Sequence, residues 1–470
     1  MRMTRRDFLS ASAALALQPA LGVRTMAAPL PRQADVVVIG AGAAGVAAAR
    51  RIAAAGRSVI VVEAANRIGG RCLTDATTFE VPFDRGARLL HNPDSNPMAK
   101  LARDAGIGVF PVPAGQKIRV GRRNARAGET EEFLATLVRA NRAIDEAARG
   151  RVDVSCADAL PSNLGDWTAT VQFTLGPSAT GKDLAQLSAM DQSRAQDRIA
   201  AIGCRPGLGA LVTKLGADVP VALSTPASRV VWSGRDVGVE TTAGRIAARA
   251  VIATVSSNVL TSGHLRFAPE LPKRHLDAAA KLSLGSYDRV ALWLANNPLG
   301  LAHDDVMIEQ STDAKTGLLL ANIGGSSLCA VDVAGSFGRD LSAQGERAMV
   351  AFATEWLTKL FGSDAARAVK VSTATRWNAE PFVLGAMSAA APGGQPSRRI
   401  LMEPLGSLFF AGEAAHETLW GTVHGAWESG ERAADAALKK LRPAAAAPSA
   451  APSRKPRRRH TSHAERGHVR

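Results

Sequence analysis

The 470-residue chain has few cysteines and no long apolar run. Its four cysteines lie far apart and form no Cys-x-x-Cys pair, so they predict neither a metal site nor a disulfide scaffold and leave only one isolated disulfide open. No stretch reaches the ~20 apolar residues of a membrane-spanning helix, so we expect no stable membrane insertion. The length allows a large buried core and predicts two domains.

The net positive charge of the body of the chain is small. The formal net charge is +15, but residues 1–28 contribute +3 and residues 443–470 contribute +6, which leaves +6 for the rest. So small an excess predicts no nucleic-acid partner. The body also shows no cluster of acids that would receive a polycation.

The two ends differ from this body. Arg5 and Arg6 precede an Ala/Leu-rich stretch with small residues near position 28, and this pattern resembles a twin-arginine export signal. We therefore expect residues 1–28 to be a signal peptide and the protein to be periplasmic. Residues 443–470 are rich in Pro and Ala and then in Arg, without apolar periodicity, which predicts a disordered basic tail.

The most informative region lies between residues 35 and 71. The apolar run 36–39 predicts a buried strand, 43–55 a helix, and 58–62 a second strand that ends at Glu63. A glycine-containing turn joins the first strand to the helix, and Glu63 follows its last glycine, Gly45, by 18 residues. This order of elements is the setting that a dinucleotide-binding fingerprint requires.

Three glycines shape the turn between that strand and helix. Gly40 permits the tight turn, Gly42 leaves room for a pyrophosphate, and Gly45 lets the helix pack closely on the strand. Ala43 and Ala44 belong to the first helical turn, where free N–H groups and the helix dipole favour phosphate binding.

The residues after the second strand indicate which dinucleotide is bound. The Glu63 carboxylate can accept hydrogen bonds from both ribose hydroxyls. Beyond it, small residues and arginines suit a long dinucleotide whose pyrophosphate and flavin end need further contacts: Ala64, Arg67, Gly69, Gly70 and Arg71. We therefore infer that the cofactor is FAD and not NAD.

The later sequence alternates between helical and strand patterns. Helices are predicted over 131–149 and 181–200, and strands over 227–232, 237–242, 248–254 and 408–411. The pattern predicts an α/β fold in which a Rossmann-like FAD domain is assembled from separated segments and interleaved with an α+β substrate domain. We assign 34–90, 203–268 and 400–442 to the first domain, and 91–202 and 269–399 to the second.

Several stretches together resemble the flavin amine oxidase family, which includes monoamine oxidases, polyamine oxidases, L-amino-acid oxidases and tryptophan 2-monooxygenase. They are the opening motif through Arg71, then 83–87, 251–255, 376–378, 409–413 and 421–430. The resemblance implies hydride transfer from the carbon next to an amine to flavin N5, with oxygen returning the flavin to its oxidised state and yielding hydrogen peroxide. Ala386 stands where monoamine oxidases carry a flavin-linked cysteine, so FAD is expected to be non-covalent.

The resemblance also implies further contacts to the cofactor. Gly412 and Glu413 would face the pyrophosphate and ribityl chain, and the N–H groups of Thr422 and Val423, at the start of a predicted helix, would lie by flavin N1 and O2. A helix dipole aimed there favours reduction of the flavin. The backbone of Val230 would hold the adenine. Gly86, Ala87 and Arg88 complete the expected cofactor-binding set.

Three side chains are candidates for the chemistry. His91 resembles a histidine of polyamine oxidases and either binds substrate and tunes amine protonation or is a hydrogen-bonded loop residue. Arg289 takes the place of a lysine that holds a water against N5; it alters oxygen reactivity, binds an anion, or forms a surface ion pair with Asp288. Trp377 packs beside the flavin or simply in the core.

The substrate is less well defined. Met387 and Thr422 replace the two tyrosines of monoamine oxidases, which weakens a small aromatic monoamine as substrate. We predict an FAD-dependent amine oxidase for a primary or secondary amine, with oxygen as acceptor. One alternative is an L-amino-acid oxidase or tryptophan 2-monooxygenase type, with Arg88 or Arg289 holding a carboxylate. Another is an FAD-binding protein without oxidase activity.

Overall fold

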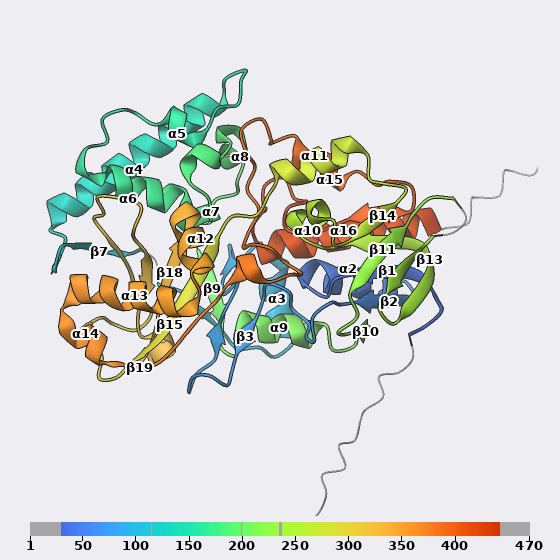
Figure 1. The fold of residues 1–470 in the computed structure, drawn as a ribbon, viewed down its shortest axis with the longest axis horizontal. Helices are drawn as coiled ribbons and strands as arrows, with labels where there is room; N and C mark the ends of the chain where they lie inside the picture. The colour runs from blue at the N-terminus through green and yellow to red at the C-terminus, as the bar shows by residue number, and fades with distance from the viewer. Residues whose placement is uncertain (1–29, 114, 199, 235–236, 442–470) are drawn as a thin grey trace, which may run out of the picture.

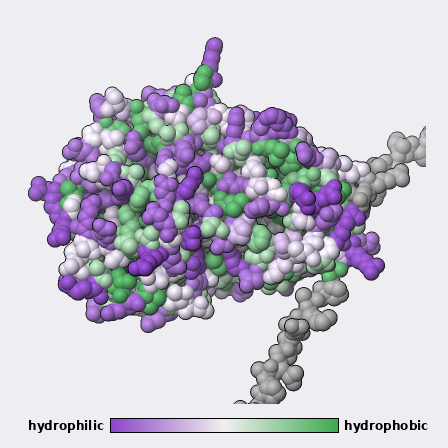
Figure 2. All heavy atoms as spheres, in the orientation of Figure 1, coloured by the Kyte–Doolittle hydropathy of each residue, from purple (hydrophilic) through white to green (hydrophobic). Residues whose placement is uncertain are grey.

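The computed structural model describes residues 30–113, 115–198, 200–234 and 237–441. Its two large sheets lie in opposite halves of the molecule (Figure 1). The expected export signal and basic tail fall outside the described residues and stay predictions. Within the described ranges, no helix is long and apolar enough to cross a membrane. Figure 2 shows a mostly hydrophilic face with scattered small apolar patches.

The first sheet has eight strands around a parallel centre. The order is β10-β2-β1-β13-β12-β11-β14, and β20 also pairs with β13. The bounds are β1 (Gln33–Ile39), β2 (Val59–Val62), β10 (Val221–Ala222), β11 (Ala227–Val231), β12 (Gly238–Thr241), β13 (Gly244–Ala253), β14 (Arg266–Ala268) and β20 (Leu408–Phe410). Because β1, β2, β13 and β20 run parallel, their carboxyl ends meet at one edge.

Two helices pack together against this sheet. They are α2 (Ala43–Ala54) and α16 (Val423–Leu441), and both contribute alanines to a buried cluster with β1 and β13. A Cβ atom on Gly430 would lie 2.1 Å from the Ala44 carbonyl oxygen. The close approach of the two helices therefore depends on a glycine at this crossing.

The second sheet has the order β19-β15-β18-β17-β16-β7-β8. Its strands are β7 (Lys117–Val120), β8 (Arg123–Asn124), β15 (Tyr287–Leu294), β16 (Val306–Glu309), β17 (Leu318–Leu320), β18 (Leu328–Ala334) and β19 (Val369–Ala374). Helix α13 (Glu346–Phe361) covers one face and buries Met349 and Trp356 against β15 and β18. The two sheets take their strands from different parts of the chain, but the predicted domain boundaries stay predictions.

The remaining helices and strands lie around these two sheets. The helices are α3 (Pro97–Asp104), α4 (Ala127–Ala148), α5 (Cys156–Ala159), α6 (Thr168–Leu175), α7 (Pro177–Thr180), α8 (Ala189–Ser193), α9 (Leu208–Leu215), α10 (Ser257–Ser262), α11 (Lys273–Lys281), α12 (Gly335–Ala343), α14 (Ser363–Arg367) and α15 (Ser397–Met402). The strands are β3 (Thr74–Asp75), β4 (Phe83–Asp84), β5 (Leu90–His91), β6 (Val109–Pro111) and β9 (Ala201–Cys204).

The predicted elements around the dinucleotide motif are confirmed, but the prediction of a helix over 181–200 is wrong. The six strands and the helices at 43–55, 131–149 and from 423 all form, with ends shifted by a few residues. Helix α4 begins four residues before its predicted start because Glu129 accepts the Arg126 N–H at 2.7 Å and caps the first turn. No single helix spans 181–200, where a 3₁₀ turn and the short α8 form instead.

A buried ion pair holds that segment in place. Asp191 of α8 accepts two hydrogen bonds of 2.7 Å from Arg398 of α15, and both side chains are almost completely buried. The Arg398 guanidinium also lies 4.7 Å from the centre of the Trp420 ring. This long-range contact holds α8 against α15.

We expect Asp191→Ala to lower the free energy of unfolding by about 3–5 kcal/mol, because it leaves a buried guanidinium without its charge partner. Glu403→Ala is the matched control, since Glu403 forms an exposed bidentate pair with Arg274, and its loss should cost less than about 1 kcal/mol. Urea unfolding of both variants measures the difference. Equal losses would contradict the structural role of the buried pair.

Candidate dinucleotide and amine site

The glycine turn between β1 and α2 is built for close backbone contacts. Gly40 has φ +101°, and a Cβ atom on Gly45 would lie 1.8 Å from the Gly40 carbonyl oxygen. Gly42 begins α2 without a side-chain cap, and no acid lies in the first turn, which contains Ala43 and Ala44. The N–H groups there are therefore suited to a phosphate.

Glu63 lies at the end of β2, next to this turn. Its Oε2 accepts the Ala41 N–H at 2.6 Å and its Oε1 accepts the Ala65 N–H at 2.8 Å, with Ala64 half-buried between them. Each carboxylate oxygen has a further lone pair that can accept a hydrogen bond from a ribose hydroxyl. The position matches the ribose-binding acid of a dinucleotide fold.

The loop after Glu63 folds back over the glycine turn. The Gly69 N–H donates to the Ala41 carbonyl at 2.9 Å, and Arg67 Nη1 donates to the Gly70 carbonyl at 2.8 Å. A Cβ atom on Gly42 would have only the Gly70 Cα within 4 Å, at 3.9 Å. Small residues on both sides therefore keep a space beside the first turn of α2.

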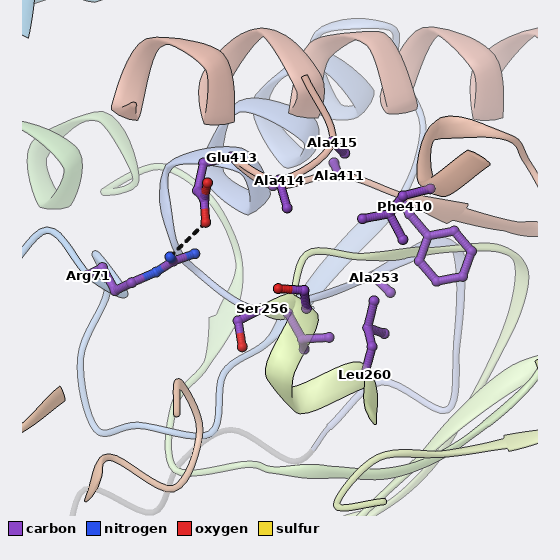
Figure 3. A pocket seen from close by; sticks show the side chains of 13 residues that line it. Arg71, Ala253, Ser256, Leu260, Phe410, Ala411, Glu413, Ala414 and Ala415 are labelled. Atoms are coloured by element: carbon purple, nitrogen blue, oxygen red, sulfur yellow. Dashed lines mark hydrogen bonds and ion pairs between the residues drawn. The ribbon is translucent and has the colours of Figure 1, made fainter. Parts of the chain in front are cut away.

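Arg71 connects this loop to the C-terminal part of the chain. Its Nη1 donates to Glu413 at 2.8 Å and to the Ala386 carbonyl at 2.6 Å. Gly412, with φ +141°, and Glu413 follow β20 and line a pocket at the carboxyl ends of β13 and β20. Figure 3 shows Arg71 and Glu413 on one side of this pocket and Leu260 on the other.

Glu413 is buried and has four hydrogen-bond donors. Besides Arg71, it accepts from the Ser388 N–H at 3.1 Å, the Ser388 hydroxyl at 2.7 Å and the Gly421 N–H at 2.9 Å. Burial alone would raise the pKa of Glu413, but the Arg71 charge and the Ser388 hydrogen bonds hold it below its ordinary value. The carboxylate is thus charged and fixed.

The start of α16 provides the next group of backbone donors. The Thr422 hydroxyl accepts the Gly425 N–H at 2.9 Å and donates to the Leu419 carbonyl at 2.6 Å, so it caps the helix. Val423 is the first helical residue, and no acid lies in the first turn. The arrangement suits the negative charge that a reduced flavin gathers at N1 and O2.

Val230 is not among the residues that line the pocket beside Arg71 and Glu413. It lies inside β11, whose residues pair with β12 on one edge and with β14 on the other. Val230 stands opposite Val239 and beside Phe267, inside the sheet, and the adenine contact expected for its backbone stays a prediction. The apolar strand was predicted correctly, but periodicity does not tell an open edge from a paired one.

Arg289 is buried and forms a bidentate ion pair with Asp332, not a surface pair with Asp288. Its Nε and Nη2 donate to Asp332 at 2.6 and 2.9 Å, while Nη1 donates to the carbonyl oxygens of Asp84 and Gly86 at 2.8 and 3.4 Å. Burial lowers the pKa of Arg289, but the Asp332 charge more than offsets this and keeps it above its ordinary value. The Tyr287 hydroxyl also donates to Asp332, at 2.7 Å.

Asp288 points to the opposite side of β15 and holds Trp377. It accepts the Trp377 N–H at 2.8 Å, and Trp377 Nε1 donates to the Arg85 carbonyl at 3.2 Å. A Cβ atom on Gly86 would lie 3.1 Å from the Trp377 ring. The tryptophan therefore packs directly on the loop that contains Gly86 and Ala87.

Arg88 and His91 follow this loop. Burial and the charge of Arg289 lower the pKa of Arg88, which donates no hydrogen bond to any other described residue. His91 is half-buried in β5, and its Nδ1 is a buried atom without a partner among the described residues. Burial, with the charges of Arg198 and Arg88, lowers the pKa of His91 from 6.5 to about 4, so the imidazole is neutral at pH 7.

Three residues of the site were absent from the sequence candidates. Asp332 had a usable signal, because an acid inside an apolar strand is seldom buried without a partner. Ser388 and Arg198 lie in irregular segments and gave no such signal. Cys72, Cys156, Cys204 and Cys329 are all free and buried, and no group of three or more metal-binding side chains occurs among the described residues.

The chain belongs to the family of flavin-containing amine oxidoreductases, whose model matches residues 43–438. It is therefore a flavin-dependent oxidoreductase, with FAD as a non-covalent cofactor. The residues around Gly42, Glu63, Arg71 and Glu413 fit that cofactor, because they combine a glycine-lined space, a helix N-terminus, cations and a ribose-binding acid.

Two kinds of curated relative are similar to the chain. The Lysine-specific histone demethylase 1 homolog 3 of Oryza sativa subsp. japonica is 26% identical over 439 residues, which cover 86% of this chain and 54% of the relative. The chain thus spans about half the length of such relatives. The Probable polyamine oxidase 4 of Arabidopsis thaliana is 27% identical over 435 residues, covering 85% of this chain and 86% of the relative.

Solved structures of amine oxidases share the fold. Wild-type putrescine oxidase bound to putrescine gives a TM-score of 0.73 at 18% identity, covering 87% of this chain and 99% of the other. Cyclohexylamine oxidase from Brevibacterium oxydans IH-35A gives 0.73 at 21% identity with the same coverage. The predicted α/β fold of the amine oxidase type is confirmed.

We expect Gly45→Ala to lower the free energy of unfolding by about 1–3 kcal/mol or more and also to lower the FAD content. The new methyl group would meet the Gly40 carbonyl and push α2 away from β1. Gly128→Ala is the control, since nothing lies within 4 Å of its Cβ position in α4. That change should be neutral or stabilise by up to about 1 kcal/mol. The flavin-to-protein absorbance ratio and thermal unfolding test both variants.

We expect the free energy of unfolding to fall as the pH decreases from about 6.5 towards 4, and His91 to account for part of this fall. In that range the unfolded chain protonates a histidine that the folded chain keeps neutral. His91→Gln should make the profile less steep, while His303→Gln, at an exposed position, should not. Urea unfolding at about pH 7, 5.5 and 4.5 measures this. Parallel profiles for wild type and His91→Gln would contradict it.

Proposed function

We propose that the protein is an FAD-dependent amine oxidase that takes a hydride from the carbon next to a primary or secondary amine, with oxygen as the final acceptor and hydrogen peroxide as product. The observation that carries this proposal is the Arg71–Glu413 contact, which brings the dinucleotide turn and the start of α16 to one place. Bound FAD supplies the hydride acceptor there.

The protein's own residues would bind and orient the amine. His91 lines a second cavity and is neutral at pH 7, so its imidazole could accept a hydrogen bond from an N–H group of the substrate. Trp377, held by Asp288 and packed on Gly86, would keep the loop beside the cofactor in place. The start of α16 offers partial positive charge where negative charge develops.

Arg289 is proposed to support the site through its pairing with Asp332. All three of its nitrogen atoms donate to protein oxygens, so it holds the 84–86 loop against β15. A guanidinium so constrained differs from the mobile ammonium of a lysine. We infer that Arg289 positions this loop and does not hold a water against flavin N5.

Anaerobic reduction of the purified holoenzyme tests the amine oxidase proposal. We expect the oxidised flavin absorbance to bleach with at least one member of a panel of amines and amino acids, and to return with hydrogen peroxide when oxygen is admitted. A fully loaded flavin that no member of the panel reduces would favour an FAD-binding protein without oxidase activity. Reduction without peroxide on admission of oxygen would point to another electron acceptor.

A further inference from the structure

A second cavity adjoins the start of α16 and is separate from the pocket beside Arg71. It lies between β5, the segment before β9 and the first turn of α16. His91, Arg198, Thr422 and His424 contribute the polar side chains that define it, together with two asparagines. Thr422 and Val423, which the family resemblance places at the flavin, line the same cavity, so its contents would lie next to the ring.

Arg198 gives this cavity a positive charge. One Nη2–H donates to the Trp420 carbonyl at 2.9 Å, and the guanidinium lies 5.7 Å from the centre of the Trp420 ring. Its Nε and Nη1 donate to no other described residue. The backbone and the ring thus fix the guanidinium, while part of its hydrogen-bonding capacity stays free for a ligand.

No acidic side chain is found among the described residues that line the cavity. Glu413 acts electrostatically on Arg198, but its carboxylate already binds Arg71, Ser388 and Gly421. Glu428 lies behind His424, with 2.8 Å between Glu428 Oε1 and His424 Nε2. The cation in the cavity is therefore not neutralised by a carboxylate in its lining.

The neighbouring groups also favour an anion. The buried, neutral His91 has an unpartnered Nδ1 and adds no negative charge. The first turn of α16 contains no acid and presents its positive dipole end. A substrate with several positive charges would meet repulsion here, whereas a carboxylate would gain a charge-assisted hydrogen bond.

We propose that this cavity binds the carboxylate of an amino-acid-type amine, with Arg198 as its charge partner. The proposed substrate class rests on the amine oxidase function proposed above. Arg198 would set the position of the carboxylate and thereby the carbon that faces the flavin. The residue acts as a specificity determinant, since it contacts the substrate and takes no part in the transfer itself.

The holoenzyme allows binding and turnover to be measured separately. Benzoate, a carboxylate without an amine, is titrated against the flavin absorption spectrum. Anaerobic flavin reduction is then followed with matched pairs: L-leucine and isopentylamine, L-phenylalanine and phenethylamine, L-lysine and cadaverine. Wild type is compared with Arg198→Gln, Arg198→Lys and Arg88→Gln. Arg205→Gln is the matched control, because the exposed Arg205 also lies over an aromatic ring, that of Phe110.

We expect wild type to bind benzoate and to prefer each amino acid over its decarboxylated partner. Arg198→Gln should weaken benzoate binding and reduce this preference by about tenfold or more, since it removes a hydrogen bond between charged groups. Arg198→Lys should keep part of the benzoate binding and part of the preference for amino acids. Arg205→Gln should behave as wild type. The flavin content and thermal unfolding of each variant show whether it folds; if Arg198→Gln does not, the comparison rests on Arg198→Lys.

Three results would overturn the proposal. They are faster reduction by the decarboxylated amines, unchanged benzoate binding in Arg198→Gln, and loss of preference in Arg88→Gln alone, which would move the charge partner to Arg88. Reduction by amines but not by amino acids would leave the amine oxidase function intact while rejecting this substrate class. Conversely, benzoate binding that depends on Arg198 without any reduction would retain the anion site and reject the oxidase function.

Discussion

The ion pair between Arg71 and Glu413 is the contact on which the dinucleotide site depends. It joins residues 342 positions apart in the sequence and sits where β13 and β20 end. A carboxylate buried this deeply is tolerated only when it is paired and hydrogen-bonded. Because Ser388 and Gly421 supply the other donors, the same carboxylate also fixes the loop before α16 and a segment that leads back to the second sheet.

The part of the fold that sequence predicted best is the part in which neighbouring residues determine the geometry. The turn from β1 to α2 requires glycine at positions 40 and 45. Gly40 has a positive φ, and a Cβ atom on Gly45 would collide with the Gly40 carbonyl oxygen. Such requirements are local, so the strand, turn, helix and acid of this unit could be predicted together. The apolar strands β13 and β20 and the start of α16 were predicted for the same reason.

Contacts between distant segments could not be predicted in this way. A surface ion pair between Arg289 and Asp288 was one of the alternatives for Arg289, but successive side chains of a strand point to opposite faces. The register of β15 with β18 places Asp332 directly opposite Arg289, and nothing near Arg289 in the sequence records that register. Likewise, helical periodicity at 181–200 did not reveal that Asp191 pairs with Arg398, 207 residues away.

These long-range pairings decide the electrostatic character of the candidate site. Asp332 neutralises Arg289, so that cation contributes geometry and little net charge, whereas Arg88 and Arg198 have no carboxylate hydrogen-bonded to them among the described residues. Burial, together with the charges of these two cations, lowers the pKa of His91 and keeps it neutral at pH 7. A positive field at this position favours negative charge on a bound ligand and equally on a reduced flavin. The charge of Arg198 would therefore act on the reduced flavin as well as on the bound carboxylate, although Arg198 takes no part in the transfer itself.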